Sequence, residues 1–172
     1  MPAWVALLRG INVGGKHALP MAHVRAAFAG AGAKGVATYI QSGNVVFTHP
    51  SPSATKLATA LEAIAGFPVP IVLRSHAELT AVIATNPFGG ELAHCMFLPA
   101  VPPEKALTKL TAIDPTLGLP SRFAYRGREI YLDLPAGIGR DKLAATVFRA
   151  VPDATTRNWR TVLKLQEMIA AL

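Results

Sequence analysis

The sequence predicts a protein of mixed α and β structure (α+β) built from two similarly ordered halves. Short apolar runs alternate with segments of helical periodicity, and their order in residues 1–90 nearly recurs in residues 91–172. Hydrophobic residues make up 51% of the 172 residues and charged residues 16%, which excludes a disordered chain. At this length about 70% of the unfolded surface can be buried, so the core needs no disulfide or metal.

The first half is expected to contain strand, helix, strand, strand, helix and strand. Their predicted ranges are 3–8, 19–32, 36–41, 44–48, 53–65 and 68–73. Pro20 suits the first turn of the first helix. Ser53 is a candidate N-cap for the second helix and Gly66 a stop signal for it. Ser42-Gly43 predicts a hairpin turn. This order is that of a ferredoxin-like, split β-α-β unit.

The second half nearly repeats that order after a short linking helix at 77–84. Its predicted ranges are 95–98, 103–111, 122–125, 129–134, 141–150 and, for a terminal helix, 158–172. A last strand is not clear, although residues 154–156 could form a short one. We therefore expect two domains, 1–90 and 91–172, the second a β-α-β-β-α half followed by the C-terminal helix.

Charge is unevenly distributed along the chain. Seventeen Lys and Arg residues oppose ten Asp and Glu residues, a formal charge of +7, yet residues 1–61 contain no carboxylate and the first acid is Glu62. A site built from this segment cannot be a two-carboxylate catalytic pair or a hard-cation cage. It could bind an anion, or its basic residues could serve solubility alone.

The topology places two polar segments at one end of the first sheet. The first two strands of a split β-α-β unit run parallel, so the end of strand one, the start of helix one and the first hairpin turn lie together. These segments are the loop 9–16 and the turn 41–44, about thirty residues apart in sequence. Two of the most Gly- and Asn-rich parts of the half are thus expected to meet.

Loop 9–16 has features of an anion-binding segment. Its glycines permit positive φ and close backbone approach, and the helix that follows presents free N–H groups. It matches neither G-x-x-x-x-G-K-[ST] nor G-x-G-x-x-G. A loop or turn that only redirects the chain remains open for both segments, and a purely structural role remains open for Arg157 and Asn158. The candidate ligand-binding residues are Arg9, Asn12, Gly14, Gly15, Lys16, Gln41, Ser42, Asn44, Arg157 and Asn158.

Catalytic and metal-binding patterns are sparse. The five histidines show no paired spacing typical of zinc ligands, so no metal and no cofactor are expected. His94 and Cys95 are sequence neighbours that a strand would point to opposite faces. Ser42 with His17 is the one nucleophile–base pairing that the converging loops offer. We assign no catalytic residue.

Nothing in the sequence indicates export or membrane insertion. The N-terminus lacks a basic segment before its short apolar run, and no apolar stretch approaches the ~20 residues of a membrane span. The single cysteine fits a reducing compartment. We expect a cytoplasmic protein.

Three segments resemble domain-of-unknown-function family 1697. They are Leu7 to Gly15 (LLRGINVGG), Thr38 to Phe47 (TYIQSGNVVF) and Thr156 to Val162 (TRNWRTV), with Asn86-Pro87-Phe88 between the last two. The resemblance covers essentially the whole chain and implies a shared fold in a bacterial, soluble family. It implies no activity and identifies no catalytic residue. Arg160 stands where the family often has Asn.

Three functions are compatible with these observations. The first is an anion-binding domain whose ligand is a nucleotide, a phosphorylated metabolite or a nucleic acid. Base stacking is poorly supported, because aromatic residues make up only 7% and no RNA-reading aromatic motif is present. The alternatives are an enzyme acting on a phosphorylated or carboxylated small molecule, and an interaction module that is a monomer or a homodimer.

Overall fold

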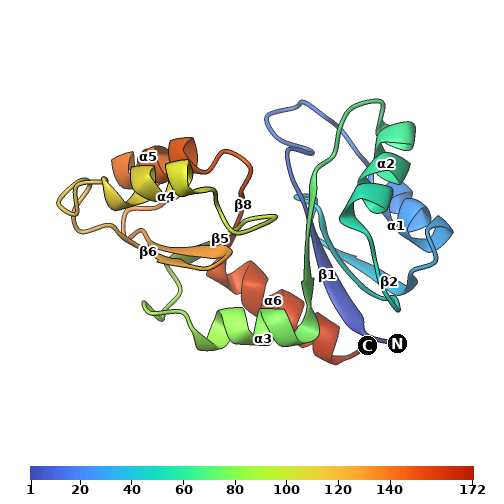
Figure 1. Cartoon of the computed structure of the whole chain (residues 1–172). Coiled ribbons are helices and arrows are strands. Elements are labelled where there is room, and N and C mark those ends of the chain that lie inside the picture. The colour runs from blue at the N-terminus through green and yellow to red at the C-terminus, as the bar shows by residue number, and fades with distance from the viewer. The chain divides into compact units, whose positions relative to one another are not determined.

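The computed structural model describes all 172 residues and contains eight strands and six helices (Figure 1). The strands form two four-stranded antiparallel sheets, one in each of two compact units. The first unit comprises Met1–Ala81 with Leu163–Leu172, and the second comprises Val82–Val162. The predicted α+β class with two repeated β-α units is confirmed. A domain boundary at residue 90 stays a prediction.

The first unit contains the six elements predicted for the first half, and α3 continues from it into the second unit. They are β1 (Ala3–Leu8), α1 (Met21–Gly30), β2 (Lys34–Tyr39), β3 (Asn44–Thr48), α2 (Ala54–Ala65), β4 (Ile71–Ser75) and α3 (His76–Ala84). The sheet order is β2-β3-β1-β4, and β3 is antiparallel to both β1 and β2. Strands β1 and β2 therefore run parallel and end at the same end of the sheet. We call this end, with the loops that follow it, the loop end.

Capping residues set the ends of the helices in the first unit. Ser53 Oγ accepts a hydrogen bond from the Lys56 amide at 3.3 Å at the start of α2, and Gly66 closes α2 with a φ of 77°. Both were predicted. Helix α1 begins at Met21 behind Pro20 rather than at residue 19, and ends at Gly30. Its first turn has no side-chain cap.

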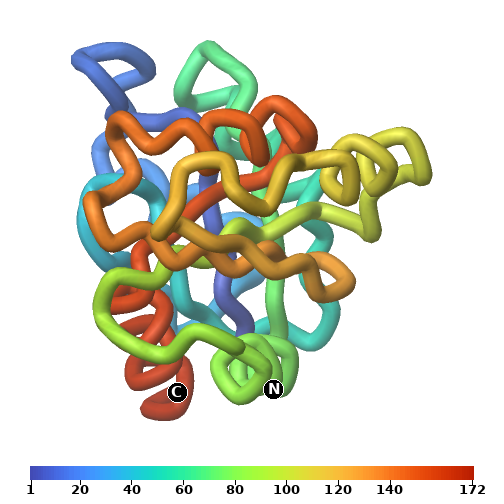
Figure 2. Tube along the Cα trace, turned by 90° about the vertical axis from the view of Figure 1, so that its left-hand side faces the viewer, coloured from blue at the N-terminus to red at the C-terminus, as the bar shows by residue number.

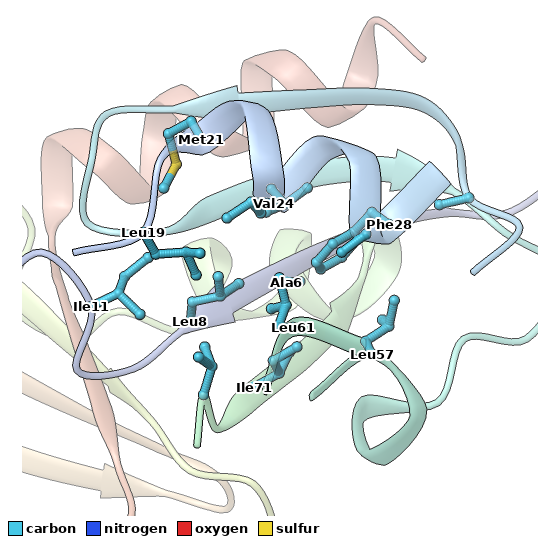
Figure 3. Close-up of a cluster of buried hydrophobic side chains, with 14 of the residues drawn as sticks. Ala6, Leu8, Ile11, Leu19, Met21, Val24, Phe28, Leu57, Leu61 and Ile71 are labelled. Carbon is cyan, nitrogen blue, oxygen red and sulfur yellow. The ribbon is translucent and has the colours of Figure 1, made fainter. Parts of the chain in front are cut away.

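The core of the first unit lies between the sheet and the helices α1 and α2 (Figure 3). Alternate residues of β1, such as Ala6 and Leu8, point toward Val24 and Phe28 of α1 and Leu61 of α2. Figure 3 also shows Ile11 and Leu19, from the two ends of the loop that follows β1, within this cluster. The base of that loop is thus fixed by burial.

The second unit repeats the arrangement with different loops. It contains β5 (Ala93–Phe97), α4 (Glu104–Thr111), β6 (Arg122–Arg126), β7 (Glu129–Asp133), α5 (Lys142–Ala150) and β8 (Thr155–Asn158). The sheet order is β6-β7-β5-β8, which matches β2-β3-β1-β4 strand for strand. Helices α4 and α5 cover one face of this sheet (Figure 1).

The fourth strand of the second sheet corrects the expectation that this half lacks a clear last strand. Strand β8 pairs antiparallel with β5. Its sequence, Thr-Thr-Arg-Asn, has no apolar alternation, but Thr155 and Arg157 are buried on one face. Helix α6 (Trp159–Ala170) follows directly. None of the six helices has the length and apolar character that a membrane span requires.

Candidate functional site

The segment after β1 forms a small hairpin that extends beyond the sheet (Figures 1 and 2). Val13 and Lys16 form an antiparallel bridge, and the Lys16 amide donates to the Val13 carbonyl at 2.9 Å. Between them, Gly14 and Gly15 have φ values of 57° and 73°. Two successive positive φ values define a type I′ turn, which glycine adopts without strain. The exposed amides of Gly14 and Gly15 donate no hydrogen bond within the chain.

Asn12 joins this hairpin to the β2–β3 turn. Its Nδ2 donates to the Gln41 carbonyl at 2.7 Å and to the Leu19 carbonyl at 3.0 Å, while its Oδ1 accepts from the Leu19 amide at 2.8 Å. Leu8 adds a backbone link, because its amide donates to the Gly43 carbonyl at 2.8 Å. The structure therefore brings loop 9–16 and turn 41–44 together. The side chain of Asn12 is engaged in holding them so.

Backbone strain is concentrated in these two segments. The chain has three non-glycine residues with positive φ: Asn12 at 52°, His17 at 53° and Ile40 at 49°. Asn12 lies in loop 9–16, His17 follows that loop directly, and Ile40 directly precedes turn 41–44. The left-handed region costs most non-glycine residues about 1–2 kcal/mol; asparagine tolerates it best, and a β-branched residue such as Ile40 tolerates it least. The surrounding hydrogen bonds hold the backbone in these conformations.

The remaining polar residues of the turn have defined partners. Asn44 is fully buried, and its Nδ2 donates to the Tyr39 carbonyl at 3.0 Å and to Ser42 Oγ at 3.1 Å. Gln41 is exposed and contributes its carbonyl to Asn12. Asn44 thus shapes the turn from inside, and Gln41 presents its amide side chain to solvent.

His17 does not support a nucleophile–base pair with Ser42. Its Nδ1 lies 3.0 Å from the Gly10 carbonyl, and its ring stacks on Phe67 with centroids 4.5 Å apart. These contacts attach the hairpin to the segment after α2. An activated serine needs the base within hydrogen-bond reach of its hydroxyl, and both of these contacts direct the His17 ring to other partners.

Two cations belong to the hairpin segment. Lys16 is exposed beside the turn, whereas Arg9 is half-buried at the base, where its amide donates to the Pro70 carbonyl at 3.0 Å. Arg25 on α1 donates to Thr38 Oγ1 at 2.8 Å. With no carboxylate among residues 1–61, positive charge on these segments is not neutralised from within them.

Arg157 and Asn158 belong to β8 in the second unit. The Arg157 guanidinium is buried and donates to Thr155 Oγ1 and to the Thr156 carbonyl, both at 2.9 Å. Burial lowers the pKa of Arg157 to about 10. Asn158 caps helix α6, because its Oδ1 accepts from the Thr161 amide at 2.8 Å. A ligand-binding role for these two residues stays a prediction.

A buried arginine in β4 was not singled out from the sequence. Arg74 is 1% exposed and lies opposite Val5 in the first sheet, as Arg157 lies opposite Cys95 in the second. Each guanidinium donates to the carbonyl of the preceding residue, Arg74 to Leu73 at 2.8 Å. The available signal was strand alternation, which places Arg74 on the same face as the apolar Val72.

Comparison with known proteins identifies the family. The family model described as "Protein of unknown function (DUF1697)" matches residues 1–131. The chain belongs to the DUF1697 family. The loop end of the first unit lies within the matched part of this DUF1697 protein, and β8 and α6 lie beyond it.

A solved structure shares the fold of the DUF1697 chain. It is the conserved bacterial protein SP0830 from Streptococcus pneumoniae, with 22% sequence identity, a TM-score of 0.79 and 99% of each chain covered. At this identity the likeness shows the fold alone. None of the curated proteins compared with the chain matches its sequence. The comparisons thus assign a family and a fold, and leave the activity open.

Proposed function

We propose that this DUF1697 protein binds an anionic ligand where loop 9–16 meets turn 41–44. The main support is that all three non-glycine residues with positive φ lie in these linked segments or directly beside them: Asn12 in the loop, His17 after it and Ile40 before the turn. Strained backbone persists only where its surroundings hold it, and it clusters at binding sites and switches. A connection that merely turned the chain could use unstrained residues at these positions.

The groups available to the ligand are backbone amides and one flexible cation. The amides of Gly14 and Gly15 make no hydrogen bond within the chain, and glycine lets a ligand approach the backbone closely. Lys16 follows directly and adds a positive charge. Asn12 is a positioning residue, because its side-chain bonds to Leu19 and Gln41 hold the two segments in place.

Two exposed apolar side chains narrow the ligand class. Val13 is 64% exposed on the hairpin and Ile40 is 49% exposed on the adjoining turn. Apolar surface beside anion-binding groups fits a ligand with an apolar body and a phosphate. A nucleotide, alone or within a nucleic acid, meets that description better than inorganic phosphate.

The proposal extends to the classification of the protein. Each unit would be a ferredoxin-like, split β-α-β unit, supported by the shared order β2-β3-β1-β4 and β6-β7-β5-β8. The single cysteine is buried and free, which agrees with a cytoplasmic location. The protein would act as a monomer or a homodimer.

Thermal unfolding in the presence of candidate anions tests the proposal. A ligand at one hundred times its Kd stabilises the native state by about 2.7 kcal/mol, a rise in Tm of roughly 5–10 °C for a chain of this size. We expect this rise with nucleotides or short oligonucleotides and a smaller one with phosphate. Affinity that falls steeply with salt for the oligonucleotide alone would identify nucleic acid as the ligand.

Matched lysine variants make the test specific. Lys16→Ala should weaken binding about tenfold, the loss of one charge-assisted contact of about 1.4 kcal/mol. Lys105→Ala removes another exposed lysine, from α4 in the second unit, and should leave binding unchanged. If no anion raises the Tm, or if both variants bind like the parent chain, the proposal is wrong.

A further inference from the structure

The second unit contains an apolar pocket that the proposed function does not use. The pocket has a volume of about 290 Å³ and lies between the segment that joins β5 to α4 and the end of α5 with the loop that follows it. Its lining residues are Leu98, Pro99, Ala100, Val101, Pro102, Pro103, Ala106, Ala150, Val151, Pro152 and Asp153. Apolar cavities of roughly 150 Å³ already accept benzene, so this pocket is large enough for a single or fused ring.

The wall of this pocket offers few hydrogen-bond donors, chiefly the amides of Ala100 and Val101. Four of its residues are prolines, which have no N–H. The amides of Leu98, Ala106 and Val151 are occupied, since they donate to the carbonyls of Arg128, Pro103 and Val147 at 2.9, 2.8 and 3.2 Å. An anion needs donors or cations, and the one charged lining residue is the acidic Asp153. The lining therefore disfavours the ligand class proposed for the first unit.

The shape and chemistry of the lining favour a flat aromatic ring. Proline rings are rigid, and their C–H groups next to the amide nitrogen carry partial positive charge, which is attracted to the negative face of a π-system. The same pairing of proline with aromatic rings underlies recognition of Pro-rich peptides. Leu98, Val101 and Val151 add aliphatic surface of the kind that lines small-molecule sites.

We propose that this pocket binds a neutral aromatic ring. The ring belongs to a small molecule such as an indole or a phenol, or to an aromatic side chain of a peptide, and both present the same face to the prolines. The pocket occupies the loop end of the second sheet, because the Leu98–Arg128 bond repeats the Leu8–Gly43 bond of the first. It is a separate site from the one proposed above, and the two can fail independently.

Titration followed by backbone-amide NMR shifts tests this site with four probes. The probes are indole, phenol, an N-acetylated tryptophan amide peptide and naphthalene sulfonate. We expect indole and phenol to shift amides of Ala100, Val101 and Asp153 and to bind at least tenfold tighter than the sulfonate. A peptide that binds at least tenfold tighter than indole assigns the ring to a polypeptide partner. If neither ring source shifts these amides, or if the sulfonate binds best, the proposal is overturned.

Substitutions of two lining residues test whether the ring binds in this pocket. Ala106→Leu adds three carbons on α4 and should weaken indole binding at least tenfold by filling the pocket. Ala145→Leu is the matched control, since Ala145 is exposed on α5 and is not a lining residue. Val101→Ala trims a side chain that is 61% exposed and should weaken binding two- to fivefold without affecting the fold. Unchanged affinity in both Ala106→Leu and Val101→Ala would place the ring elsewhere.

Discussion

The two loop ends of the molecule start from the same geometry and differ in chemistry. In each sheet an amide at the end of β1 or directly after β5 donates to the neighbouring hairpin turn, Leu8 to Gly43 and Leu98 to Arg128. In the first unit the following segment is a glycine hairpin with exposed amides. In the second, three of the five residues of segment 99–103 are prolines, which have no N–H. The same sheet end thus presents different groups to solvent in the two units, set by a few loop residues rather than by the fold.

At the loop end of the first unit, the backbone of Gly43 lies close to the side chains of Leu8 and Ile11. The second unit has no glycine at the corresponding position. A Cβ at Gly43 would lie 2.6 Å from Leu8 Cβ and 2.8 Å from Ile11 Cδ1, whereas Arg128 occupies the corresponding acceptor position in the second unit. Gly43 therefore lets the turn approach the central strand. The second unit reaches the same hydrogen bond with a full side chain at that position.

The largest expected effect follows from filling that contact. Gly43→Ala should lower the free energy of unfolding by about 2–4 kcal/mol, because the φ of 89° disfavours alanine and Leu8 lies in a buried central strand that cannot move aside. Chemical denaturation measures the loss. Gly127→Ala is the control, since Gly127 also has a positive φ but no atom near its Cβ position. That variant should lose only about 1 kcal/mol; equal losses would show that Gly43 is not crowded.

Much of this comparison could be predicted from the sequence, because it depends on chain topology. Once the order of strands and helices is known, the end of the first strand and the first hairpin turn must lie together, and the Asn12–Gln41 bond shows that they do. The end of α2 at Gly66 could also be predicted, because it depends on the backbone conformation that glycine itself adopts.

The hydrogen-bond partners of side chains and the existence of a polar strand could not be predicted from the sequence. The sequence presents Asn12 as a ligand-binding residue, but its amide is used for bonds to Leu19 and Gln41. Strand β8 has no apolar alternation, and it forms because β5 supplies hydrogen-bond partners and because Thr155 and Arg157 find buried surroundings. Such features depend on neighbours distant in sequence.

A second difference between the sheets predicts how stability changes at high pH. Val46 lies opposite Val5 in the first sheet, whereas Tyr131 lies opposite Cys95 in the second. The Tyr131 hydroxyl donates to the Val82 carbonyl at 2.7 Å and lies 2.8 Å from Thr85 Oγ1. Burial raises the pKa of Tyr131 from 10.0 to about 12.

The sign of the effect follows from which state holds the proton. Between pH 10 and 12 the unfolded chain loses the Tyr131 proton while the folded chain retains it. Stability from this residue is fully present below pH 10 and is lost as the pH rises through 12. The lowered pKa of Arg157 acts in the opposite direction above pH 10, because the folded state releases that proton first.

The Tyr131→Phe variant separates these contributions. It should lose about 1 kcal/mol of stability at neutral pH through the missing hydrogen bonds. Denaturation series above pH 10 should then show a smaller loss of stability with rising pH than in the parent chain. A parallel decline in the two proteins would mean that Tyr131 ionises equally well in the folded and unfolded states.

The smallest expected effect distinguishes a structural from a functional requirement for glycine in the first hairpin. Asn-Gly is a preferred sequence for a type I′ turn, and asparagine tolerates positive φ while restricting the unfolded chain more than glycine does. Gly14→Asn should therefore raise the free energy of unfolding by a few tenths of a kcal/mol, or leave it unchanged.

If glycine is present so that an anion can approach the Gly14 and Gly15 amides, the same variant should weaken nucleotide binding several-fold. Thermal unfolding with and without nucleotide measures both effects on one sample. A variant that gains stability and keeps full affinity would assign Gly14 to turn geometry alone, and anion recognition would then have to rest on Lys16.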